Sequence, residues 1–439
     1  MTSASAAPYA YDDAPLRPFH LRVALASFGG VFSDGYGLGI IGISLTQAKA
    51  ALQITPLWLG LLGGASLAGL FLGALVTGPG ADRYGRRPIY AYNMLLLAAF
   101  ASLQWFVQSA PQLLALRLVI GFLLGTDYVV SKALLTEFTP RAFRGRIMST
   151  LSVAWAGGYT CAYFAGYALT GHGPDAWRWM LATSAVPCLL VLPLRLLLPE
   201  SPLWLSAHGR DRDAAAVVTR HVGPNVLPPA ARAVAPSTQG RWAQLLSRDW
   251  RRRTLVACVF FTCQVIPYFA VGTFVTRVLD ALDVGDSFLG GLAYNLSLLG
   301  GAVLGLLVVD RMPRRTFLVG SFAITSLALL PLLVIDQPAA SLIVVLFAIF
   351  AGVLSAASNL VYVYLPELFP TRLRASGIGL AIAASRIGSA VSTFLLPVAM
   401  SRYGVQTALG ACAAVLAFGG LLCHAWAPET RHSALDAAA

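Results

Sequence analysis

The stretch GPGADRYGRR (78–87), which follows an apolar run, is echoed in the second half of the chain by LVVDRMPRR (307–315). The aspartates of the two copies, Asp82 and Asp310, lie 228 positions apart. Two further pairs repeat at nearly the same offset: EFTPRAFRG (137–145) with ELFPTRLRA (367–375), and PES (199–201) with PET (428–430). A constant offset over so much of the chain predicts two homologous halves joined by a polar segment.

The composition around these repeats is that of a membrane protein. The chain has 439 residues, of which 57% are hydrophobic and 11% charged, and its mean hydropathy is +0.71. So little charge excludes a soluble globular surface, and the apolar runs are long enough to cross a bilayer as helices. We predict an all-α membrane protein in which the first run is retained as a span rather than cleaved as a signal peptide. The twelve predicted spans are 22–45, 57–79, 89–107, 113–136, 147–169, 177–198, 254–280, 287–309, 316–335, 341–365, 374–400 and 407–426.

The basic residues indicate the orientation. Lys and Arg gather in both tails and in every second loop, whereas the other loops hold only Lys49 and Arg402. By the positive-inside rule both termini are expected in the cytoplasm, and the net charge of +12 marks topology, not a nucleic-acid partner. The expected domains are a tail (1–20), a six-helix bundle (21–198), a linker with short helices (199–253), a second bundle (254–426) and a tail (427–439).

The motifs resemble those of the major facilitator superfamily, in its sugar-porter and metabolite:proton symporter branches. The resemblance covers about residues 20–432 and rests on GPGADRYGRR, RLVIGFLLG (117–125), EFTPRAFRGR, PESPLWL, PELFPTRLRASGIG and PET. It implies two pseudo-symmetric bundles that rock around a site at the middle of the membrane. It also implies a transporter, not an enzyme, that needs no cofactor and is driven by a proton gradient.

The repeated signatures themselves are charged and lie at the cytoplasmic ends of predicted spans. Family resemblance implies that they form ion-pair networks which latch these ends together when the site faces outward. A few kcal/mol would be enough to bias two such states. The residues expected in this latch are Asp82, Arg83, Arg86, Arg87, Glu137, Arg144 and Glu200 in the first half, and Asp310, Arg311, Arg314, Glu367, Arg374 and Glu429 in the second.

Of the charged residues within predicted spans, four are singled out as candidates: Asp34, Asp127, Lys132 and Arg386. Charge in hydrocarbon is costly, so function is the first reading, with buried structural ion pairs as the alternative. Asp127 and Lys132 are about 140° apart around a helix and are not expected to pair with each other. Asp34 and Asp127 are competing proton carriers, and proton-coupled relatives place such an acid near the residue corresponding to Arg117. That acid commonly follows a Gly-Tyr pair, where this chain has Gly37.

The substrate is inferred by elimination. Sugar porters typically carry several side-chain amides in their fifth and seventh spans. The corresponding spans of this chain, 147–169 and 254–280, contain one, Gln264. Aromatic residues and the two cations Lys132 and Arg386 take the place of these amides. This combination suits an organic anion, either an aromatic acid or a sugar acid. The expected substrate-binding residues are Lys132, Arg386, Tyr36, Trp155, Tyr159, Gln264, Tyr268, Tyr294, Asn359 and Tyr362. Lys132 either binds the substrate carboxylate or serves as counter-ion to Asp34 or Asp127.

The sequence therefore predicts a proton symporter for a small organic anion, with a proton-coupled exporter and a sugar or polyol porter as alternatives. We expect a monomer in the lipid bilayer of a bacterial inner membrane, since arginine far outnumbers lysine and alanine is abundant. All six cysteines fall in predicted spans without metal-ligand spacing, so neither disulfides nor a metal site are expected.

Overall fold

The structure is a computed structural model that describes residues 9–229, 244–335, 337–369 and 371–430, except the side chains of residues 371, 372, 374 and 375. Within these residues the chain is helical, and its one β-bridge joins Tyr9 to Val226. The fold is therefore an all-α one, as predicted.

The first half forms a bundle of long helices. Thr55 caps one of them by accepting a hydrogen bond from the amide of Trp58 (3.4 Å), with Pro56 at the first helical position, where its missing amide hydrogen costs nothing. The helices are α1 (Pro18–Ala51), α2 (Pro56–Tyr84), α3 (Arg86–Leu103) with the 3-10 turn η2 (Gln104–Phe106), α4 (Ala110–Phe138), α5 (Arg141–Leu169), α6 (Ala176–Ala182) and α7 (Ala185–Leu196).

The second half repeats this arrangement. Its helices are α11 (Arg251–Thr273), α12 (Val275–Ala281), α13 (Ser287–Val308), α14 (Arg314–Leu329), α15 (Pro331–Val334), α16 (Ala340–Ser358), α17 (Leu360–Glu367) and α18 (Thr371–Trp426). α18 is two spans, because Gly404 interrupts it with a positive φ of 86° that other residues rarely adopt.

The predicted number of spans is confirmed. Ten helical segments in the described chain are long and apolar enough to cross a membrane, and one of them, Ser376–Trp426, contains the kink at Gly404. α5 is long enough but carries more polar side chains, as expected for a helix that faces the other half instead of lipid. Four predicted spans are each divided into two helices, because proline and short turns break a span without ending it. Two further predicted spans are merged in α18.

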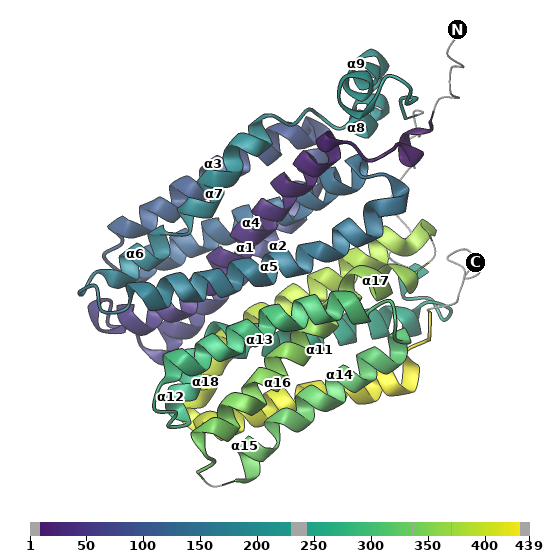
Figure 1. The fold of residues 1–439 in the computed structure, drawn as a ribbon. Coiled ribbons are helices and arrows are strands. Elements are labelled where there is room, and N and C mark those ends of the chain that lie inside the picture. The colour runs from purple at the N-terminus through teal and green to yellow at the C-terminus, as the bar shows by residue number, and fades with distance from the viewer. Residues whose placement is uncertain (1–8, 230–243, 336, 370, 431–439) are drawn as a thin grey trace.

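The two halves pack side by side, and both termini lie at one end of the bundle together with the connecting helices (Figure 1). We call this the terminal end. The halves meet where α2 packs against α18 and where α5 packs against α13. Three hydrogen bonds cross this boundary on the side away from the terminal end: Thr160 to the carbonyl of Asn295 (2.9 Å), Tyr163 with Thr276 (3.0 Å), and Tyr163 to the carbonyl of Phe288 (3.2 Å).

The connection after α7 packs on the terminal end of the first half. It contains α8 (Pro202–Ala207), α9 (Asp211–Val217) and the π-helical turn η3 (Val218–Val222). The N-terminal segment joins it, since Tyr9 exchanges backbone hydrogen bonds with Asn225 and Leu227 (2.9 Å each) and the 3-10 turn η1 (Tyr11–Asp13) buries Tyr11. The predicted tail and linker therefore share one small core, which the sequence did not indicate.

Candidate functional site

A cavity lies at mid-depth between the two halves. Asp34, Leu38, Leu70, Tyr128, Ser152 and Trp155 line it from the first half, and Phe261, Gln264, Val265, Tyr268, Phe269, Ser358, Val361, Tyr362 and Arg386 from the second. Its volume is about 90 Å³, room for a few water molecules. Because ligand sites are usually larger, the cavity in this conformation is small for a metabolite.

Two cations meet around one aromatic ring in this region. The Nζ of Lys132 lies 3.3 Å from the ring centroid of Tyr128 and 4.9 Å from that of Tyr362. The guanidinium carbon of Arg386 lies 5.1 Å from the ring centroid of Tyr128 and 5.9 Å from that of Phe269. Lys132 comes from α4 of the first half and Arg386 from α18 of the second, so the ring of Tyr128 holds two positive charges at the boundary.

Asp34 is the acid of the cavity. It lies near the middle of α1, is 3% exposed, and lines the cavity wall. Both its carboxylate oxygens are buried, and neither has a hydrogen-bond partner among the described residues. No ion pair joins Asp34 to Lys132 or Arg386 in this part of the chain. An unpaired buried carboxylate is costly as an anion, so this site favours a bound proton.

Asp127, the competing proton carrier, is already paired. Its two carboxylate oxygens accept hydrogen bonds from the guanidinium of Arg195, one of them at 3.0 Å, and from the hydroxyl of Ser131 at 2.9 Å. Both side chains of the ion pair are fully buried, and the guanidinium carbon of Arg195 lies 3.9 Å from the ring centroid of Tyr90. As expected, Asp127 and Lys132 do not pair. The arrangement of Asp127 is that of a structural ion pair, outside the cavity lining.

Arg117 is placed differently from the expectation that it lies near an acid of α1. It is fully buried and donates to the carbonyl of Gly37 (2.9 Å) and to the side chain of Gln104 (3.3 Å). Arg117 therefore contacts the backbone of Gly37, the position at which relatives commonly carry the acid, instead of Asp34.

Of the ten predicted substrate residues, Arg386, Trp155, Gln264, Tyr268 and Tyr362 line the cavity, and Lys132 lies directly behind Tyr128. Four others lie elsewhere in the interior. Tyr36 donates to Thr183 (2.9 Å), and Tyr159 stacks on Trp155 with ring centroids 5.1 Å apart. Tyr294 packs beside Gly272, and Asn359 accepts from Ser152 (2.7 Å) across the boundary. The hydrogen bond of Asn359 joins the two halves, whereas that of Tyr36 lies within the first half. Aromatic spacing alone does not tell a cavity wall from a packing face.

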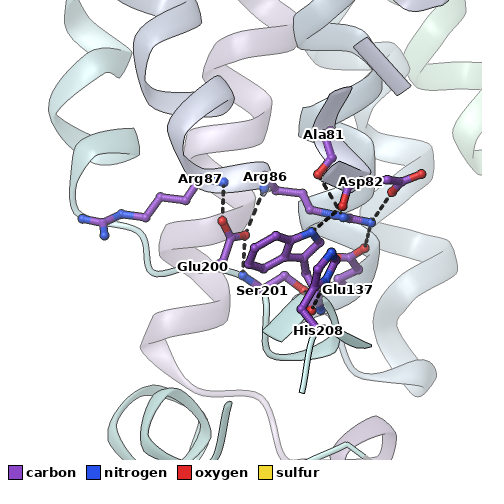
Figure 2. Close-up of polar contacts among 9 residues, drawn as sticks. Ala81, Asp82, Arg86, Arg87, Glu137, Glu200, Ser201 and His208 are labelled. Carbon is purple, nitrogen blue, oxygen red and sulfur yellow. Dashed lines mark hydrogen bonds and ion pairs between the residues drawn. The ribbon is translucent and has the colours of Figure 1, made fainter. Parts of the chain in front are cut away.

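Five of the predicted latch residues of the first half form one network at the terminal end, namely Asp82, Arg86, Arg87, Glu137 and Glu200 (Figure 2). Arg86 forms ion pairs with Asp82 (2.8 Å) and Glu137 (3.3 Å). Glu200 instead accepts hydrogen bonds from the backbone amides of Arg86 and Arg87 (3.1 Å each) and so caps α3. Gly85 makes this approach possible, since its φ of 98° is accessible to glycine and a side chain there would meet the Glu200 carboxylate.

The second copy reproduces the first. Arg314 pairs with Asp310 (3.3 Å) and Glu367 (3.5 Å), and Glu429 accepts from the backbone amides of Arg314 (2.9 Å) and Arg315 (3.0 Å). Among the described residues, the ion pairs of each network lie within one half. In this conformation they connect elements of the same half, and the latch between the halves stays a prediction.

The other latch residues have different surroundings. Arg144 pairs with Asp12 of the N-terminal segment (2.9 Å). Arg83 lies over the ring of Tyr84 (5.4 Å), and Arg311 is exposed. The side chain of Arg374 lies outside the described residues.

Three residues that make these contacts were not predicted from the sequence. Tyr128 stands next to Asp127 and one turn before Lys132, and that helical spacing was the available signal. Arg195 was noted only as a basic residue near the end of a span, and nothing in its local sequence indicates its partner. Asp12 lies in a polar tail whose docking no periodicity reveals.

Comparisons with known proteins agree with this architecture. Residues 23–439 match the family described as "Sugar (and other) transporter". The inner membrane metabolite transport protein YgcS of Escherichia coli (strain K12) is 41% identical over 98% of this chain and 96% of its own length. The putative metabolite transport protein YaaU of the same organism is 36% identical over 97% and 96%.

Among solved structures, the partially occluded inward open conformation of the xylose transporter XylE from E. coli has the same fold. Its TM-score is 0.79 at 18% identity, over 95% of this chain and 100% of that chain. With the family match over nearly the whole chain, these similarities identify a transporter and not an enzyme. The chain therefore belongs to the sugar (and other) transporter family of the major facilitator superfamily and is a multi-pass membrane transporter of metabolites.

Proposed function

We propose that this protein imports a small aromatic carboxylate together with a proton across a bacterial inner membrane, as a monomer with both termini in the cytoplasm. The observation that carries the proposal is the cavity itself, where Asp34 has no hydrogen-bond partner in the described chain and faces a wall that contains Arg386. Two cations against one acid give the region a net positive charge once Asp34 is protonated. A substrate carboxylate would offset one of these two positive charges.

The walls favour a ring on that carboxylate. Trp155, Tyr268 and Phe269 contact one another, with ring centroids 5.4 to 5.9 Å apart, and all three line the cavity. Aromatic pairs prefer such edge-to-face and tilted arrangements, which a planar substrate extends. A guanidinium such as that of Arg386 binds a carboxylate through two parallel hydrogen bonds.

More distant relatives support both the chemistry and its alternative. The niacin transporter NiaP of Acinetobacter baylyi is 27% identical over 86% of this chain, and the benzoate transport protein of that organism is 24% identical over 88%. Niacin and benzoate are aromatic carboxylates. The glucose transporter GlcP of Staphylococcus epidermidis is 26% identical over 95%, so a neutral sugar is the alternative substrate. The proton symport in this proposal is based on analogy with XylE, a proton:xylose symporter whose fold this chain shares.

The position of the charges suggests how coupling would operate. Asp34 takes up a proton from the outside, which removes the negative charge that competes with the substrate for Arg386 and Lys132. The carboxylate then binds, the halves close around it, and the site opens to the cytoplasm. Release of the substrate leaves Asp34 next to two cations again, and the proton departs.

The test is uptake into proteoliposomes under an inwardly directed proton gradient, with labelled benzoate, nicotinate and glucose. We expect the two carboxylates to accumulate and glucose not to. Asp34→Asn is expected to abolish gradient-driven accumulation but to retain exchange of labelled for unlabelled carboxylate, whereas Arg386→Gln loses both. Asp213→Asn, which removes an exposed acid of α9, is the matched control.

Protein-free liposomes correct for weak acids that cross the bilayer unaided. Accumulation of glucose alone would overturn the substrate class. Carboxylate extrusion driven by the same gradient would identify an exporter instead. Unchanged coupling in Asp34→Asn would remove Asp34 from the mechanism.

A further inference from the structure

A second group of arginines lies at the terminal end of the other half, away from the central cavity. Two adjoining cavities of about 310 and 420 Å³ share Arg252 and Trp426 as lining residues. Arg253 and Arg315 line the first cavity, and Arg251 and Leu255 line the second. We call these six residues the arginine groove. Its size is that of a small-molecule site.

Two arginines of the groove are held by backbone carbonyls. The guanidinium of Arg252 donates to the carbonyl of Ala425 (2.9 Å), and that of Arg315 donates to the carbonyl of His424 (2.5 Å). Neither these two nor Arg251 and Arg253 form an ion pair with a described acid. Glu429, the nearby acid, accepts from the amides of Arg314 and Arg315. Each guanidinium keeps further donors for an anion.

The groove continues into a lipid-facing apolar surface. Leu255, one turn after Arg251 on α11, is 46% exposed, and Phe418 and Leu421 of α18 are 56% and 71% exposed. Phe418, Leu421 and Ala425 share a helix face that leads toward Trp426. The guanidinium carbon of Arg252 lies 5.9 Å from the ring centroid of Trp426, and tryptophan rings favour the level of lipid headgroups. Charge at one end and exposed apolar side chains at the other fit a phospholipid.

We propose that the arginine groove binds the phosphate of an anionic phospholipid in the cytoplasmic leaflet, with an acyl chain along Leu255 and Leu421. The proposal rests on the orientation proposed above and not on the identity of the transported substrate. Basic pockets between helices on the cytoplasmic side are suited to anionic headgroups, and the negative leaflet supplies the ligand. An arginine fork binds a phosphate through two hydrogen bonds, which a lysine cannot reproduce.

The test is a titration of the purified full chain with dioleoylphosphatidylglycerol, with bound lipid counted by native mass spectrometry and stability followed as the melting temperature. Dioleoylphosphatidylcholine and inorganic phosphate are the comparison ligands. We expect phosphatidylglycerol to bind and to raise the melting temperature. The double variant Arg252→Gln/Arg315→Gln is expected to bind it about 25-fold more weakly, since each arginine near an anionic lipid contributes about fivefold.

The double variant Arg141→Gln/Arg146→Gln removes two exposed arginines at the terminal end of α5 and is the matched control, expected to bind as the parent does. Arg252→Lys keeps the charge and is expected to lose part of the affinity, which guards against a folding defect in the double variant. Equal binding of phosphatidylcholine, undiminished binding by the groove variant, or equal protection by inorganic phosphate would each overturn the lipid site.

Discussion

At the scale of single residues, Tyr128 organises the candidate site. Lys132 and Arg386 both lie within cation–π range of its ring. Two like charges would otherwise repel each other in a region of low dielectric constant. The quadrupole of the ring therefore offsets part of that repulsion.

Replacing this ring tests its role. Tyr128→Ala should raise the KM for the transported carboxylate by roughly 5- to 30-fold, since a desolvated cation–π contact contributes about 1–2 kcal/mol. Tyr128→Phe keeps the ring and should change KM much less. Initial uptake rates over a range of substrate concentrations give both values. Tyr84→Ala, which removes the ring beside Arg83 at an exposed position, is the control, and an equal effect there would argue against a specific role for Tyr128.

The ion pair between Asp127 and Arg195 is expected to affect the stability of the protein, whereas Asp34 is expected to affect proton coupling. Because both groups are fully buried, Arg195→Leu or Asp127→Leu leaves one uncompensated charge and should destabilise the protein by about 3–5 kcal/mol, measured as a fall in melting temperature. The double variant Asp127→Leu/Arg195→Leu should recover much of that loss. Single variants as stable as the parent would show that the pair is not structural.

At the scale of helices, the repeated signatures cap corresponding elements. Glu200 accepts from the first amides of α3 and Glu429 from the first amides of α14, so each carboxylate occupies the positive end of a helix dipole. The offset that reveals the repeat in the sequence thus has a physical cause, since both halves begin their third span on a carboxylate from after their sixth.

Amide hydrogen exchange can separate the two caps. Glu200→Ala should speed exchange at the amides of Arg86 and Arg87 by roughly 2- to 30-fold, the equivalent of about 0.5–2 kcal/mol for a lost cap, and leave those of Arg314 and Arg315 unchanged. Glu429→Ala should do the reverse, so each variant serves as the control for the other. Equal changes at both helices would point to global loosening and against local capping.

The helices and the repeats could be predicted from the sequence, whereas the contacts between side chains of different helices could not. The positions of the spans follow from runs of apolar residues, and a run such as 57–79 leaves little doubt that α2 is a helix. Asp34 and Arg386 were singled out because a charge in such a run stands out. Arg195 was not assigned to Asp127, since the contact joins residues 68 positions apart and depends on how α7 packs beside α4. The same limit separates Trp155, on the cavity wall, from Tyr159, one turn further along the same helix.

At the scale of the whole molecule, the described contacts are unevenly distributed about the cavity. Beyond it, away from the terminal end, Thr160 and Tyr163 bind the second half, and glycines of α2 pack directly on the backbone of α18. Toward the terminal end, Ser152 and Asn359 join the halves (2.7 Å). With the proposed orientation, the outer side is closed by backbone packing, whose relief must accompany substrate entry.

Gly60 is one residue at which this closure is sensitive to size. A Cβ added there would lie against the carbonyl oxygen of Phe394, whereas one added at Gly78 on the same helix would meet nothing within 4 Å. Gly60→Leu should therefore prevent the outer ends from closing and hold the protein open to the outside. Uptake should fall to about a tenth or less, because a closed outer side is needed before the site opens inward. Gly78→Leu is the matched control and should transport normally.

The conformation can be measured by labelling a cysteine at position 160, where the native threonine is 2% exposed. The Thr160→Cys substitution is made in a background whose six native cysteines are replaced by serine. A membrane-impermeant maleimide added from outside should label this cysteine slowly in the parent and in Gly78→Leu, and at least about tenfold faster in Gly60→Leu, since a shift of about 1.4 kcal/mol between the two states suffices for that. Slow labelling in Gly60→Leu together with lost uptake would mean that the substitution distorts the bundle without opening it. In that case the glycines of α2 serve only helix packing, and closure of the outer side depends on Thr160 and Tyr163 instead.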